Sequence, residues 1–279
     1  MKARLTILCA VSVGIMGTSV CAEEVVEEAK PEALGLEQKL ARVYDLYRKN
    51  DAVSLKPNEM QVGIGVAYAT SSQETFGVRQ STRTFTTQLF ASRGIGAGIE
   101  VSAAVPYVAT SQRAETSDAV LAKKTVFGMG DTTVRILGTL PTKEISATAI
   151  FSATFPSGKH ELSRNETHTS LGGNLNKVLR PAFVSGGLAW EHDWESNANG
   201  LGYTIGLGFF LNHALSVGGE VNGVIALNPK TGAVRDNQSM GFKVAYQTMP
   251  DFGIVVSTNT SMGTNTPQTS LGVTTYWRF

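Results

Sequence analysis

Eight ionisable side chains recur in stretches that otherwise carry small or weakly polar residues, and they are the first candidates for a functional role. These residues are Glu100, Asp131, Arg135, Glu191, Asp193, Glu220, Lys243 and Arg278. A charge removed from bulk water is costly unless it is paired or hydrated. From their comparable depths on neighbouring segments, we expect Glu100 to pair with Arg135 and Glu220 with Lys243. Such pairs either fill and stiffen an interior or form a polar constriction that selects solutes by charge and size.

His168, Thr169 and Ser170 place a base and a hydroxyl on the same side of an extended segment, as a membrane phospholipase would need. The His-x-Ser triplet is common by chance and no aligned third residue accompanies it, so we predict no catalytic site and no enzyme. His160 and His168 occur in a segment without a thiolate, and we predict neither a metal site nor a cofactor. The formal net charge of +1 offers no basic surface for nucleic acid.

The segments that carry these charges alternate bulky and small residues with a period of two, which predicts β-strands. In the first of them, one face consists of Met60, Val62, Ile64, Val66 and Tyr68. The other face consists of Gln61, Gly63, Gly65, Ala67 and Ala69. A bulky face suits lipid, and a small, weakly polar face suits a narrow lumen. The pattern therefore predicts a transmembrane β-barrel whose eight ionisable residues face the lumen.

The connections between the alternating runs set the number of strands. Eleven runs are plain, at about residues 60–70, 82–92, 96–108, 127–140, 144–155, 182–194, 201–211, 214–225, 238–248, 252–262 and 269–279. Bacterial barrels normally have an even number of strands, with short periplasmic turns and longer outer loops. The connections keep that order only if one more strand lies near residues 169–179. We therefore predict an all-β, antiparallel up-and-down barrel of about 12 strands over residues 58–279, with both termini in the periplasm.

Two segments precede the predicted barrel. Residues 1–22 combine a positive start, a short apolar stretch and small residues ending at Ala22, which is typical of a cleaved signal peptide. Residues 23–57 form a periplasmic lead, in which a short amphipathic helix has an apolar face made of Leu36, Leu40, Val43, Tyr44 and Tyr47. This helix suits three roles equally well: plugging the lumen, docking a periplasmic partner, or resting beneath the barrel.

The last strand ends with Trp277 and Phe279 on its bulky face. An aromatic residue at the end of an alternating strand resembles the C-terminal sorting signal that delivers barrels to their insertion machinery. Together with the alternating runs, this ending predicts a location in the bacterial outer membrane. The expected partners are outer-membrane lipid and the barrel-insertion machinery.

Four short motifs extend this interpretation. They are Phe127-Gly128-Met129-Gly130-Asp131, Val105-Pro106-Tyr107, Phe155-Pro156-Ser157-Gly158-Lys159 and the final Trp277-Arg278-Phe279. They resemble motifs of the phenol-degradation meta-pathway transporter family of outer-membrane barrels, and the resemblance spans residues 58–279. It implies a barrel that carries small, often hydrophobic compounds. A helix ahead of a twelve-stranded barrel is also similar to the secretion pores of functional-amyloid systems, in which the N-terminal segment plugs or oligomerises the pore.

Three functions are consistent with these observations. The first is an outer-membrane channel for passive passage of small molecules, including hydrophobic or aromatic ones. The second is a secretion or assembly pore that works with periplasmic partners through residues 23–57. The third is a surface or envelope barrel without a transport role.

Overall fold

The computed structural model of the chain describes residues 55, 57–96, 98–116, 119–141, 145–179, 181–212, 214–227, 234–249, 251–262 and 268–279. The predicted signal peptide and the predicted helix between residues 36 and 48 lie outside these ranges. The described strands are β1 (Met60–Thr75), β2 (Val78–Gly96), β3 (Ile99–Glu115), β4 (Val120–Met129), β5 (Thr132–Pro141), β6 (Ile145–Phe155), β7 (His168–Val178), β8 (Ala182–Asp193), β9 (Ala198–Phe210), β10 (Leu215–Leu227), β11 (Val234–Met249), β12 (Phe252–Ser261) and β13 (Gln268–Arg278).

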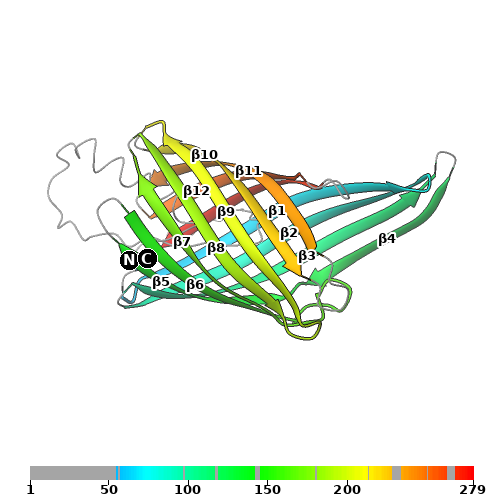
Figure 1. The fold of residues 1–279 in the computed structure, drawn as a ribbon, viewed down its shortest axis with the longest axis horizontal. Helices are drawn as coiled ribbons and strands as arrows, with labels where there is room; N and C mark the ends of the chain where they lie inside the picture. Colours follow the sequence, from blue (N-terminus) through cyan, green and yellow to red (C-terminus); the bar gives the residue numbers. More distant parts are fainter. Residues whose placement is uncertain are drawn as a thin grey trace, which may run out of the picture.

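The strands form one closed antiparallel barrel (Figure 1). Each strand from β5 to β12 pairs with the next one along the chain, and β13 pairs with β1, for example at Val66 and Val273. The pairings of β1 with β2, of β2 with β3 and of β3 with β5 complete the ring. Because β4 and β5 share one place in the wall, the ring has twelve positions, which confirms the predicted architecture. The strand expected near residues 169–179 is β7.

The fourth position of the wall differs from the prediction of one strand over residues 127–140. β5 pairs with the first part of β3, at Ile99 to Ala104, and β4 pairs with the later part, at Tyr107 to Glu115. The wall strand is therefore interrupted at Gly130 and Asp131. The break could not be predicted from the sequence, because the alternation is regular on both sides of it. A break of this kind depends on packing against other segments rather than on the local pattern.

Residues 71–81 and 109–126 separate the alternating runs predicted from the sequence and were therefore expected to form long outer loops, but they are mostly strand. β1 and β2 continue until only Phe76 and Gly77 separate them, and β3 and β4 extend to Glu115 and Val120. The sequence of these strand ends is typical of loops because neither face is apolar. A strand that extends beyond the membrane has both faces in water, however, and needs no apolar face. Figure 1 shows the resulting sheet of β1 to β4 projecting beyond the rest of the barrel.

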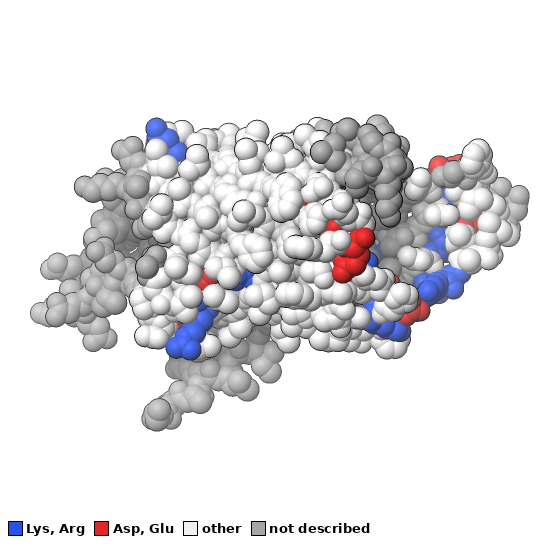
Figure 2. Space-filling model, turned by 60° about the horizontal axis from the view of Figure 1, so that its bottom comes forward, with Lys and Arg blue, Asp and Glu red and all other residues white. Residues whose placement is uncertain are grey.

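The two faces of the wall differ in chemistry as predicted. Apolar residues such as Leu89, Leu188 and Ile205 point outward and are about 59–66% exposed, whereas their strand neighbours on the inner face are small or polar. In Figure 2 the flank of the barrel is almost free of charged side chains. An uncharged, apolar exterior on a closed sheet is suited to the hydrocarbon of the outer membrane. Among the described residues there is no helix long and apolar enough to span a bilayer.

Candidate functional site

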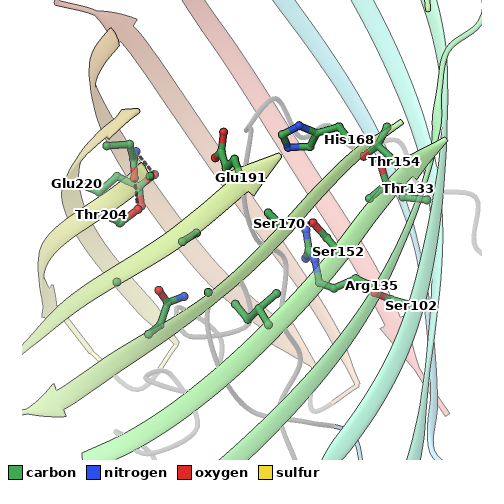
Figure 3. Close-up of a pocket in the computed structure, with 18 of the residues that line it drawn as sticks. Ser102, Thr133, Arg135, Ser152, Thr154, His168, Ser170, Glu191, Thr204 and Glu220 are labelled. Carbon is green, nitrogen blue, oxygen red and sulfur yellow. Dashed lines mark hydrogen bonds between the residues drawn. The ribbon is translucent and has the colours of Figure 1, made fainter. Parts of the chain in front are cut away.

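The interior of the barrel holds a cavity of about 450 Å³ to which β2, β3 and β5 to β13 contribute side chains. Many of its lining residues carry hydroxyl or amide groups, among them Thr86, Gln88, Thr133, Ser152, Asn174 and Thr204. In Figure 3, Glu220 and Thr204 lie on one side of this space, and Arg135, Ser152 and Thr133 lie on the other. The alternation of each strand places these residues inward, because their bulky neighbours face lipid.

Hydroxyl pairs between neighbouring strands fix part of this lining. The Ser152 and Ser170 hydroxyls are 2.8 Å apart on β6 and β7. The Thr133 and Thr154 hydroxyls, on β5 and β6, are 2.9 Å apart. Since each hydroxyl keeps a further lone pair after such a bond, the wall is both ordered and able to bind a passing polar solute.

The predicted pairing of Glu220 with Lys243 is confirmed. Lys243 Nζ donates to Glu220 Oε2 at 2.6 Å, and both side chains are about 16% exposed. Asn222 donates from Nδ2 to the other carboxylate oxygen at 3.2 Å. The neighbouring glycine, Gly241, leaves space for the glutamate, since a Cβ at Gly241 would lie 3.1 Å from Glu220 Cγ. The ion pair is thus held in a defined position on the lumen wall between β10 and β11.

Glu100 lies at the end of the barrel where the chain terminates and is 1% exposed. Its expected partner Arg135 acts on it electrostatically, but so does Arg278. The backbone N–H of Leu55, a residue that is also 1% exposed, donates to Glu100 Oε2 at 3.3 Å. Glu100 therefore has two cations near it and also holds the chain just before the first strand.

The opposite end of the lumen carries a second group of charges. His168 Nδ1 lies 2.7 Å from Asp193 Oδ1, and Arg164 Nη1 lies 3.8 Å from the same oxygen. Glu191 faces Ser170 directly across β7 and β8. The base and the hydroxyl of the His-x-Ser triplet thus have different partners, Asp193 for His168 and Ser152 for Ser170. Among the described residues, no group of three His, Cys, Asp or Glu side chains could hold a metal ion.

Asp131 has a structural task that the sequence did not indicate. Its Oδ1 accepts the backbone N–H of Gly158 at 3.1 Å, and its Oδ2 accepts that of Arg164 at 2.8 Å. We expected this carboxylate to face the lumen with the other charges. Because it lies at the break between β4 and β5, it instead holds the segment 156–167 against the wall. Gly158 packs so closely on Gly130 that a side chain there would meet the Gly130 backbone.

A largely aromatic cluster, which we call the floor, lies inside the barrel at the end where the chain terminates. It comprises Phe183, Phe210, Ala245, Val255 and Tyr276, with Phe90 and Val178 packed against them. The rings of Phe183 and Phe210 are 5.1 Å apart between centroids, and both side chains are buried. The sequence reasoning missed this cluster. The available signal was an aromatic residue on the small, polar face, as at Phe90 between Gln88 and Ser92.

The glycines opposite the floor explain how these rings fit inside a narrow barrel. Phe183 lies directly across from Gly208, and Phe90 directly across from Gly63. In each case a Cβ built on the glycine would overlap the ring. The glycines therefore let the rings lie along the wall instead of standing upright in the lumen.

Trp277 and Phe279 lie at the same end on the outward face. The ring of Trp277 is 6.1 Å from that of Phe252 between centroids. Phe279 closes the sheet through backbone hydrogen bonds with Met60. Their role as a sorting signal stays a prediction.

No family model matches the chain, and no curated protein does. Several solved structures are similar to it. An outer-membrane channel from Pseudomonas putida F1 is 13% identical with a TM-score of 0.61, covering 82% of this chain and 98% of that one. The translocator domain of the autotransporter NalP from Neisseria meningitidis is 11% identical, with a TM-score of 0.53 and coverage of 87% and 95%. The transport unit of AIDA-I from Escherichia coli is 11% identical, with a TM-score of 0.53 and coverage of 80% and 90%.

At these identities the similarity concerns the fold. Channels and secretion domains share it, so the fold alone leaves the cargo open. Taken with the apolar exterior and the closed sheet, it establishes that the chain is a twelve-stranded β-barrel of the bacterial outer membrane.

Proposed function

We propose that this barrel is a passive channel for small molecules, including hydrophobic or aromatic ones. The observation that carries the proposal is the cavity of about 450 Å³ inside a closed wall, lined by hydroxyl and amide groups. A barrel that served only as a surface scaffold would gain nothing from such a space, because filling the interior with side chains is the simpler way to stabilise a narrow barrel. The similar channel from Pseudomonas putida F1 supports the same choice.

The floor sets the kind of molecule that we expect to pass. A solute that enters the polar cavity meets Phe90, Phe183, Phe210 and Tyr276 before it can leave at the other end. A constriction made of apolar side chains disfavours water and hydrated ions. A small molecule with an apolar or aromatic part replaces contacts between the rings with contacts of its own. We therefore propose permeants that combine a ring or short apolar body with a few polar groups.

The lumen charges argue against a channel for ions of one sign. Lys243 and Glu220 neutralise one another, and Asp193 is bound to His168 and close to Arg164. Rings of like charge are what make a pore strongly selective for cations or anions. Paired charges instead leave a polar but weakly selective path, which suits uncharged or weakly charged solutes.

Conductance in planar bilayers tests this proposal. The full-length protein is compared with the double variant Phe183→Ala/Phe210→Ala, and Phe209→Ala, on the lipid-facing side of β9, is the matched control. We expect small, brief openings for the wild type, a several-fold larger conductance for the double variant, and no change for the control. Swelling of proteoliposomes in small aromatic acids and in sugars then ranks the permeants.

Two outcomes would overturn the proposal. If neither the wild type nor the double variant conducts ions or admits solutes, the barrel is not a passive channel. If a large conductance arises only after residues 23–57 are removed, the barrel is a plugged pore, and the secretion or assembly function is the better account.

A further inference from the structure

Four basic residues gather on the outward face of the sheet that projects beyond the barrel. Arg113 of β3 lies directly opposite Lys123 of β4, and Arg83 of β2 lies opposite Ser111, two residues before Arg113 on the same face. The cluster, which we call the basic cluster, consists of Arg79, Arg83, Arg113 and Lys123, all with exposed side chains. Like charges directly opposite each other on a sheet are destabilising, so this arrangement indicates a binding partner of the opposite sign.

The chain supplies part of the compensating charge. Glu115 binds Arg113 at 2.7 Å between Oε2 and Nη2. Glu74 lies directly opposite Arg79 across β1 and β2. These two carboxylates offset two of the four cations, which leaves Arg83 and Lys123 as the charges most available to an external anion.

The position of the basic cluster relative to the membrane indicates what that anion is. On the same outward face, Phe85 follows Arg83 by two residues along β2, and Phe127 follows Lys123 by four along β4. These two rings are 47% and 63% exposed. Both residues lie directly opposite Ala109 of β3, one on each side, so the rings lie at the same height on the wall. Exposed aromatic residues at the edge of the apolar band mark the boundary of the hydrocarbon. A spacing of two residues is about 7 Å along a strand, so Arg83 lies in the headgroup layer of the outer leaflet.

We propose that the basic cluster binds the phosphate groups of lipopolysaccharide, the phosphorylated glycolipid of the outer leaflet. A guanidinium offers two parallel N–H donors to a phosphate, and a lysine adds a further point charge. Long basic side chains can follow a headgroup while their methylene stems remain against the apolar surface. The bound lipid would hold the projecting sheet at the membrane surface. Figure 2 shows Lys and Arg side chains at the projecting end, together with acidic ones, whereas the middle of the flank carries few charges.

Native mass spectrometry of the full-length protein with added lipid A tests the proposal. The variant is Arg83→Gln/Lys123→Gln. The matched control is Arg93→Gln/Lys177→Gln, which removes one arginine and one lysine, both exposed, from the other end of the barrel. We expect diphosphorylated lipid A to bind the variant about tenfold more weakly than the wild type, with the control unchanged. Dephosphorylated lipid A should bind the wild type and the variant equally weakly.

Equal binding of diphosphorylated lipid A to the wild type and to the Arg83→Gln/Lys123→Gln variant would overturn the proposal. It would also fail if inorganic phosphate, at the same concentration as the lipid, displaced lipid A completely, since the cluster would then be a general anion site. Bilayer conductance of the same variant separates this proposal from the channel function, because we expect the conductance to stay at the wild-type level whichever way lipid binding turns out.

Discussion

Phe183 of β8 lies against Gly208, its direct cross-strand neighbour on β9, so closely that any side chain at Gly208 would overlap the ring. This contact ties the composition of the wall to the shape of the lumen. A glycine that is unremarkable in the sequence determines how far an aromatic ring extends into the path of a solute.

Replacing Gly208 with alanine is expected to destabilise the barrel by about 1–3 kcal/mol, because the ring of Phe183 must move into an occupied cluster. Urea unfolding of the protein in detergent measures the change. The control is Gly138→Ala, since a Cβ at Gly138 meets no atom within 4 Å. In a Phe183→Ala background, which is itself destabilised, Gly208→Ala should cost little more because the clash is gone, and a double variant as unstable as the sum of its parts would contradict this account.

The Lys243–Glu220 pair gives a prediction about ion selectivity. Lys243→Ala leaves the Glu220 carboxylate without its partner in the lumen, so the channel should favour cations. Glu220→Ala should favour anions, and the double variant should return to weak selectivity. Reversal potentials in a KCl gradient measure each case. If all three variants keep the wild-type reversal potential, the pair does not lie on the conducting path.

The hydrogen bonds accepted by Asp131 lead to a prediction about how firmly the segment 156–167 is held. Asp131→Ala removes both acceptors for the N–H groups of Gly158 and Arg164. A hydrogen bond to a charged group contributes about 1.5–3 kcal/mol, so the segment should open far more often. Trypsin, which cuts after Lys159 and Arg164, should cleave the variant about tenfold faster or more than the wild type.

The control for this experiment is Asp251→Ala, at an exposed residue in the turn before β12. Cleavage of both variants at the wild-type rate would show that the carboxylate of Asp131 does not hold the segment.

Glu161, in the same segment and outside the membrane, gives a prediction about pH. The hydrogen bond and charge of Lys159 lower the pKa of Glu161 below its ordinary value, and Lys124 adds a smaller effect. A lowered pKa in the folded state stabilises the fold above the unfolded-state pKa, and this contribution is lost as the pH falls through the folded-state pKa. Since the side chain is exposed, the contribution is small and screened by salt.

A ¹³C NMR titration of the Glu161 carboxyl tests this order of causes. Lys159→Met should raise the pKa of Glu161 toward its ordinary value, and Lys124→Met should raise it less. The reverse order would show that Lys124 is the main partner.

The two-residue alternation was enough to predict the barrel, the facing of the strands and the pairing of Glu220 with Lys243. These features depend on local pattern, because a side chain two positions along a strand returns to the same face. The number of wall positions followed from the lengths of the connections, which led to the strand now described as β7.

What the sequence did not indicate depends on contacts between distant segments. The break at Gly130 requires the segment 156–167 to occupy it, and only the register of β3 with both β4 and β5 reveals it. The floor requires Phe183, Phe210 and Tyr276 to converge from β8, β9 and β13 at one end. The alternation in the sequence already places these three residues on the inner face of their strands. Whether they come into contact depends on the order of the strands and on their stagger.

The most direct test of the central claim compares two adjacent residues of β9. Thr204 lines the cavity, whereas Ile205 faces lipid and is 66% exposed. Each is replaced by cysteine in a protein whose Cys9 and Cys21 are serine, and a charged thiol reagent is added during bilayer recording. The account predicts that the reagent reduces the conductance of Thr204→Cys and leaves that of Ile205→Cys unchanged. Equal effects on both variants, or an effect on Ile205→Cys alone, would contradict the claim that solutes pass through the polar interior.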